Sequence, residues 1–140
     1  MSNMEKAYEI AQEMLKDRLR QEDPEAAEQL ESVGEHDVIV VSGQYDHIGS
    51  VFELSKTPHT RVLPHELDAV SLRPDQVVFV NCPGHVRAPG ARNLTSFVEE
   101  GGFLFTTDWA LKYVIQPAFP GYLEYNGQGT LDSDTPGLTP

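Results

Sequence analysis

Hydrophobic residues recur every three or four positions over the first twenty residues of the chain. Met4, Tyr8 and Leu15 belong to this stripe, and charged residues fill most of the positions between them. Such spacing is typical of an amphipathic helix. Residues 23–25, Asp-Pro-Glu, then supply an N-cap, a first-turn proline and a first-turn acid, which predict a second short helix. Residues 1–35 are therefore expected to form an N-terminal arm of two amphipathic helices.

From residue 36 the pattern changes to short apolar runs that alternate with helical segments. Strands that alternate with helices over short connections form βαβ units, which place the strands in a parallel sheet. The sequence therefore predicts an α/β, flavodoxin-like three-layer sandwich over residues 36–116, with a parallel sheet of about four strands. Its strands are predicted at residues 38–43, 60–63, 76–81 and 103–108, its helices at 47–54, 91–100 and 109–115, and a connector or single helical turn at 67–74.

The last part of the chain, residues 117–140, is rich in proline and glycine and has no apolar periodicity. Such a segment is an extended wrap over the domain, a disordered tail, or a truncated continuation of the domain. With only four recognisable strands, we expect that the last strands of a doubly wound domain are missing.

Composition narrows the function classes. The chain has 140 residues and a formal net charge of -12, so nucleic acid and anionic membranes would be repelled. Its single cysteine excludes an intramolecular disulfide and favours a reducing compartment. No apolar stretch is long enough to span a bilayer, and the first residues lack the apolar core of a signal peptide. We therefore expect a soluble, cytoplasmic domain without a cofactor, for which a bacterial source is the natural one.

Half of the net charge lies in the arm, because residues 1–36 contain ten acidic and four basic side chains. Two interpretations of this arm stay open. Its helices cover an open face of the domain with their apolar stripe, or they dock onto another protein or a second copy of the chain. The acidic surface is solvent-exposed in the first case and faces the partner in the second.

Polar and titratable residues gather at three predicted strand ends, whereas the strands themselves are almost wholly apolar. In an open parallel sheet, ligands bind outside the carboxyl ends of the strands, where the strand order reverses. We therefore expect a small-ligand site at this edge of the sheet. Its candidate residues are Gln44, Tyr45, Asp46, His47, Asn81, Gly84, His85, Asp108 and Trp109.

Two reactive chemistries are conceivable at these strand ends. Cys82, with His85 or His47 as its base, would give a small cysteine-dependent hydrolase or transferase. The simpler interpretation is a buried thiol at a strand end. A metal site built from Asp46, His47, Cys82, His85 and Asp108 has suitable ligand types. These residues show no strong metal-binding spacing, however, so no metal is expected.

Two residues after the fourth predicted strand have structural interpretations as well. Asp108 precedes the next predicted helix and would cap it. Trp109, the only tryptophan, would anchor the core rather than stack on a ligand.

An apolar strand and Gly/Pro-rich turn at residues 77–84 precede a helix end, Phe-Val-Glu-Glu-Gly-Gly, at 97–102 and a further strand at 103–109. In this arrangement the chain resembles the class I glutamine amidotransferase-like superfamily, and within it the ThuA-like branch. The strand at 38–43 stands in the order of the family's first strand. The resemblance covers little more than half of the chain, and it implies a fold rather than an activity.

Catalysis is not implied. Enzymes of the superfamily place a cysteine in a tight Gly-x-Cys-x-Gly elbow after the strand that corresponds here to residues 103–107. Residues 107–110 read Thr-Asp-Trp-Ala instead, and no histidine follows His85 to complete a triad. We therefore expect a degenerate, non-catalytic member that acts as a protein-interaction or ligand-sensing module. Its expected partners are a protein or a second copy bound through the N-terminal helices, and a small ligand at the strand ends.

Overall fold

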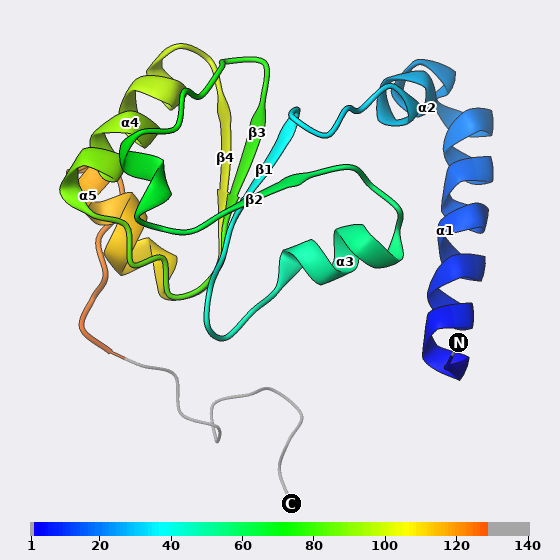
Figure 1. The fold of residues 1–140 in the computed structure, drawn as a ribbon, viewed down its shortest axis with the longest axis horizontal. Helices are drawn as coiled ribbons and strands as arrows, with labels where there is room; N and C mark the ends of the chain where they lie inside the picture. Colours follow the sequence, from blue (N-terminus) through cyan, green and yellow to red (C-terminus); the bar gives the residue numbers. More distant parts are fainter. Residues whose placement is uncertain (1, 129–140) are drawn as a thin grey trace, which may run out of the picture.

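The structure, a computed structural model, describes residues 2–128 and contains an N-terminal helical arm followed by an α/β domain (Figure 1). The arm consists of α1 (Asn3–Glu22) and α2 (Pro24–Glu31). The sheet contains β1 (Val38–Val41), β2 (Thr60–Val62), β3 (Val77–Val80) and β4 (Phe103–Thr106). The remaining elements are α3 (Ile48–Leu54), the 3-10 turn η1 (Glu66–Asp68), α4 (Ala88–Glu99), the π-helical turn η2 (Leu111–Ile115) and α5 (Gln116–Ala118).

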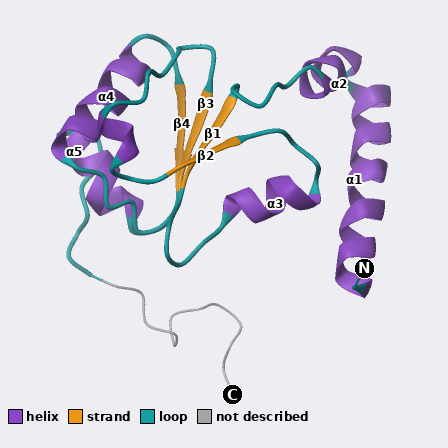
Figure 2. Ribbon diagram, in the orientation of Figure 1, coloured by secondary structure: helices purple, strands orange, loops and turns teal. Residues whose placement is uncertain are grey.

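All four strands are parallel and lie in the order β2-β1-β3-β4, which is a flavodoxin-like arrangement. The predicted fold class is thus confirmed. Helices lie on both sides of the sheet, with α4 and α5 on one side and α3 on the other (Figure 2). Two helix predictions were inaccurate in detail. Helix α4 begins at Ala88, because Pro89 suits the first helical turn. The helix predicted at 109–115 begins only at Leu111, as the π-helical turn η2, and α5 follows it.

The main core lies between the sheet and the layer of α4, η2 and α5. Alternate residues of the central strands point to this side, among them Val41 and Val78, which are completely buried. Leu94 of α4 and Val114 of η2 pack against them and are buried as well. Full burial of one large apolar side chain stabilises the folded chain by about 1.5–3 kcal/mol relative to leaving that side chain exposed. This layer therefore holds the carboxyl ends of the strands in a fixed arrangement.

The opposite face of the sheet is covered over β1 and is open over β4. On this side, Phe52 of α3 meets Phe79 of β3 edge-on, with ring centroids 5.0 Å apart. Phe79 in turn contacts Phe105 of β4 at 5.4 Å. Phe105 is 45% exposed and Phe103 is 61% exposed, whereas Val40 of β1 is buried. The third layer is therefore incomplete over the edge strand.

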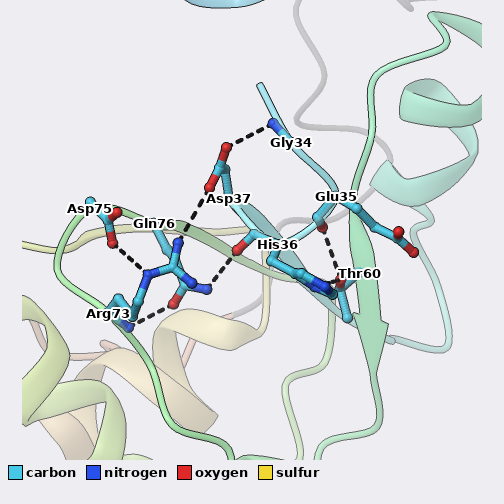
Figure 3. A network of polar contacts seen from close by, with 8 residues as sticks. All are labelled: Gly34, Glu35, His36, Asp37, Thr60, Arg73, Asp75 and Gln76. Atoms are coloured by element: carbon cyan, nitrogen blue, oxygen red, sulfur yellow. Dashed lines mark hydrogen bonds and ion pairs between the residues drawn. The ribbon is translucent and has the colours of Figure 1, made fainter. Parts of the chain in front are cut away.

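A polar network at the amino ends of β1 and β3 fixes the segment that joins α2 to the sheet (Figure 3). Gln76 is buried, and its side-chain amide donates to the carbonyl of His36 at 2.6 Å. The Asp37 carboxylate accepts from the Gly34 N–H at 2.7 Å and lies 3.3 Å from the Arg73 guanidinium. The point at which the arm leaves the domain is consequently held by several hydrogen bonds.

The arm does not cover the domain with its apolar stripe. Helix α1 begins with a capping box formed by Ser2 and Glu5, and none of its residues is buried. Arg20 near its end joins Glu31 of α2 at 2.7 Å. The interpretation of the arm as a cover over an open face is therefore wrong for α1.

The first part of the predicted tail packs on the domain. Ala118 is buried, and its carbonyl accepts from the Thr95 hydroxyl of α4 at 2.8 Å. The Tyr125 N–H donates to the Gln116 side chain at 3.1 Å. Residues 117–128 thus contribute to the structure, whereas residues 129–140 of the predicted tail lie outside the described residues.

Candidate functional site

The strand order reverses between β1 and β3, because β1 is followed by β2 on one side and then by β3 on the other. The loops after these two strands approach each other closely. A Cβ atom at Gly43 would lie 2.3 Å from the carbonyl oxygen of Cys82. That carbonyl instead accepts from the N–H groups of Gln44 at 2.8 Å and Tyr45 at 3.3 Å. The predicted strand-end residues of both loops are thus brought together.

Asp46 joins three strand ends. Its Oδ1 accepts from the backbone N–H of Cys82 at 2.6 Å, and its Oδ2 accepts from the Thr107 hydroxyl. The same Cys82 N–H also lies 3.1 Å from Thr107 Oγ1. Beside this cluster, the side-chain oxygen of buried Asn81 accepts from the Ile48 N–H at 3.2 Å. Asp46 and Asn81 therefore position the loops and are occupied within the protein.

The Cys82 thiol is buried and faces a carboxylate. The side chain is 1% exposed, and Sγ lies 3.6 Å from Asp108 Oδ2, to which the S–H donates. Burial raises the pKa of this thiol, a backbone hydrogen bond from Trp109 lowers it, and the charges of Asp108 and Asp46 raise it further. The net shift is upward, so the sulfur is a neutral thiol at neutral pH rather than a thiolate nucleophile.

We expect Cys82 to be alkylated by iodoacetamide at pH 7.5 at least roughly tenfold more slowly in the folded chain than in urea, since burial suppresses both ionisation and access. Mass spectrometry of timed samples measures the two rates on the same single cysteine. Rapid alkylation of the native protein below pH 8 would contradict the assignment and would favour the cysteine-dependent enzyme.

The two histidines proposed as bases are His47 and His85. His47 precedes α3 and makes no side-chain capping hydrogen bond, and His85 packs against Tyr113 with ring centroids 5.0 Å apart. Among the described hydrogen bonds, neither ring contacts Cys82. Within residues 2–128, no group of three or more His, Cys, Asp or Glu side chains is placed to hold a metal ion. Among the described contacts, neither a Cys–His pair nor a metal-binding group is therefore formed.

Asp108 occupies a constrained turn between β4 and η2. Its backbone φ is 44°, in the left-handed region that non-glycine residues seldom adopt, although aspartate is among those that tolerate it. Its side chain accepts from the Cys82 thiol, and η2 has no side-chain cap. The predicted capping role of Asp108 is therefore wrong. The turn presents an exposed carboxylate at the carboxyl end of β4.

A cleft of about 560 Å³ opens beside this turn, and it is lined by one tryptophan, two tyrosines, one histidine, one proline and one carboxylate. A second cleft of about 450 Å³ shares Asp108 and Trp109 with the first. Trp109 is 38% exposed, so it is not the core anchor that one interpretation predicted. The lining residues of the first cleft are Tyr45, Pro83, His85, Asp108, Trp109 and Tyr113.

An ammonium group already sits among aromatic rings at the border of the two clefts. Lys112 Nζ lies 5.6 Å from the ring centroid of Trp109 and 5.4 Å from those of Tyr113 and Tyr125. The rings of Trp109 and Tyr125 contact each other at a centroid separation of 5.2 Å. We call these three aromatic residues the ring cluster. It is an arrangement that stabilises a cation by its negative ring faces.

Three residues of this site, Lys112, Tyr113 and Tyr125, are not among the candidates that the sequence predicts. For two of them a signal existed, because Trp109, Lys112 and Tyr113 stand three and four positions apart and so share a helical face. Tyr125 lies in the segment that was interpreted as a tail, and nothing in its sequence neighbourhood indicates that the chain folds back onto Gln116.

Comparisons with known proteins add no assignment, because no protein-family model, no curated protein and no solved structure gives a significant match to this chain.

Proposed function

We propose that the chain is a non-catalytic, amidotransferase-like domain that senses a small ligand, and that this ligand is an organic cation bound by the ring cluster. The observation that carries the proposal is the Lys112 ammonium, which lies within 6 Å of three ring centroids. Lys112 occupies the position that a ligand ammonium would take. Because it is an exposed and flexible side chain, it can swing into solvent when a ligand enters.

Charge favours the same ligand class. The carboxylates of Asp108 and Glu124 line the cleft next to the ring cluster, and the chain carries a formal net charge of -12. A surface of one sign raises the local concentration of ions of the opposite sign and speeds their association. A quaternary ammonium group with an apolar body satisfies both the rings and the carboxylates.

The way in which the strand-end groups are used supports a non-catalytic role. Asp46 accepts two hydrogen bonds from neighbouring loops, and Cys82 is a buried thiol whose pKa is raised. Among the described residues, the groups that remain free to face a ligand in the first cleft are mainly aromatic rings, His85 and the Asp108 carboxylate. Such a lining is suited to binding a ligand that has both apolar and charged parts.

We expect the domain to work in the cytoplasm, since its acidic surface and single cysteine suit a reducing compartment without nucleic-acid contacts. Within residues 2–128, none of the helices combines the length and the hydropathy that crossing a bilayer requires.

Choline is expected to bind and to change the fluorescence of Trp109, which is the only tryptophan of the chain. Lys112→Met removes the competing ammonium but keeps the side-chain length, so choline should bind about fivefold more tightly, the equivalent of roughly 1 kcal/mol of cation–π interaction. Fluorescence titration of the wild type and the variant measures both affinities.

Two controls are needed. The first tests whether the charge of the ligand matters in addition to its shape, and the second tests whether the effect belongs to Lys112 rather than to any surface lysine. The neutral isostere 3,3-dimethylbutan-1-ol has the shape of choline without its charge, and it should bind at least tenfold more weakly. Lys6→Met makes the same change on α1, away from the ring cluster, and should leave the choline affinity unchanged. Equal binding of the two probes, or no effect of Lys112→Met, would refute the cation site.

A further inference from the structure

Helix α1 turns its apolar stripe away from its own domain. Glu9 and Gln12 are half-buried and face the domain, and Glu9 Oε1 lies 3.4 Å from Lys56 Nζ at the end of α3. Three members of the stripe, Met4 (68% exposed), Tyr8 (44%) and Leu15 (53%), lie on another side of the helix. Met14 is 68% exposed as well and lies at the rim of the cleft between α1 and the end of α3. The helix is thus attached to the domain mainly by polar residues and exposes its large apolar ones except Leu19, which is half-buried.

The sheet has an uncovered apolar face. On the face that α3 leaves open, β4 exposes Phe103 and Phe105, and within residues 2–128 no helix lies over this face of the strand (Figure 1). Parallel sheets are almost always covered on both faces, because their strands are apolar on both sides. The open face of β4 therefore lacks the kind of element that α1 is, an amphipathic helix with a free apolar stripe.

Within one chain, α1 is separated from the open face of β4. Helix α3 lies between α1 and the sheet (Figure 1). The segment after α2 is held at the amino ends of β1 and β3 by hydrogen bonds from Asp37 to Gly34 and from Gln76 to His36 (Figure 3). These bonds fix the point from which the arm leaves the domain, so α1 would have to pass α3 to reach the open face of the same chain.

We propose that α1 packs on the open face of β4 in a second copy of the chain, and that the second copy returns the same contact. The arrangement is a two-fold dimer with two identical contacts, in which each apolar stripe covers the partner's Phe103 and Phe105. It satisfies both unpartnered faces at once, which pairing of one α1 with another would not do.

The size of the interface is sufficient. Helix α1 has 20 residues and is therefore about 30 Å long. A fully buried aromatic side chain contributes roughly 150–250 Å², and each contact includes parts of Tyr8, Phe103 and Phe105 in addition to the two methionines and Leu15. Two contacts in one dimer are on the order of the 1,200–2,000 Å² that stable interfaces bury.

Sedimentation equilibrium of the full chain is expected to give a dimer. Leu15→Glu on the helix and Phe103→Lys on the sheet each place a charge in both contacts, so each variant should weaken the dimer on the order of a hundredfold. An equimolar mixture of the two variants should dimerise more strongly than either alone, because one of its two contacts is unaltered. Leu123→Glu, the same change at another exposed leucine, should leave the dimer intact.

The same measurements show whether the chain forms no dimer or forms one through a different surface. A wild-type chain that is monomeric at 100 µM overturns the proposal. Loss of the dimer in Leu15→Glu but not in Phe103→Lys also overturns it, because it shows that α1 pairs with α1. Since both side chains are exposed, the variants should keep the circular dichroism of the wild type. Met14→Glu and Phe105→Lys repeat the test at neighbouring positions if either of the first pair unfolds.

Discussion

Gly43→Ala is expected to destabilise the domain by about 3 kcal/mol, the upper end of what overpacking costs. A Cβ atom at this position would lie 2.3 Å from the carbonyl oxygen of Cys82 and 2.6 Å from Cβ of Asn81. Both atoms belong to the loop after β3, which cannot retreat without breaking the hydrogen bonds that Gln44 and Tyr45 donate to Cys82. Urea unfolding followed by circular dichroism measures the loss of unfolding free energy.

The matched control is Gly34→Ala, at a glycine where the nearest atom to an added Cβ is the Asp37 carboxylate oxygen at 3.2 Å. That oxygen is the end of a side chain and can shift, so the variant should stay within about 1 kcal/mol of the wild type. If Gly43→Ala is equally mild, the two strand-end loops are not packed as closely as described. Choline binding should also fall in Gly43→Ala, because Tyr45 and Pro83 of the cleft belong to these loops.

Asp46→Ala is expected to cost about 2 kcal/mol of unfolding free energy, since it leaves the Cys82 N–H with only the longer contact to Thr107. The loops after β1, β3 and β4 would lose the one side chain that joins them. Urea unfolding gives the stability, and the choline titration shows whether the cleft widens.

Asp46→Asn provides an internal comparison, because the amide oxygen can still accept from Cys82 while the amide nitrogen donates to Thr107. Its loss should be about half of that in Asp46→Ala. Asp75→Ala removes an exposed carboxylate that pairs with Arg73 at 3.0 Å, and should change the stability by less than about 0.5 kcal/mol. Equal losses in the three variants would mean that Asp46 acts only through its charge.

The fold could be predicted because its signals are local. Short β-branched runs such as residues 38–41 have the pattern of a buried parallel strand, and glycines and prolines mark where strands and helices end. Strand order and the direction of crossovers follow from general rules for βαβ units. The open face of β4 could not be predicted, because Phe103 and Phe105 have the same sequence pattern whether or not another element covers them.

The candidate site could be predicted in position but not in role. Asp46, Asn81 and Cys82 are indeed adjacent, since the carboxyl ends of parallel strands meet. Which of them bind neighbouring loops and which face a ligand depends on side-chain directions that no spacing reveals. The contribution of Tyr125 depends on a chain reversal with no sequence signal, so the ring cluster became visible only in three dimensions.

The position of β4 at the edge of the sheet affects how readily the chain aggregates. Its outer backbone N–H and C=O groups have no partner strand in the described sheet, and two of its four side chains are exposed phenylalanines. Such an edge invites strand-to-strand stacking between molecules. The acidic surface opposes open-ended stacking of many chains, because each further chain adds a formal charge of -12, whereas the closed dimer proposed above joins only two chains through two apolar contacts. The net negative charge thus lowers the tendency of the chain to aggregate through its edge strand.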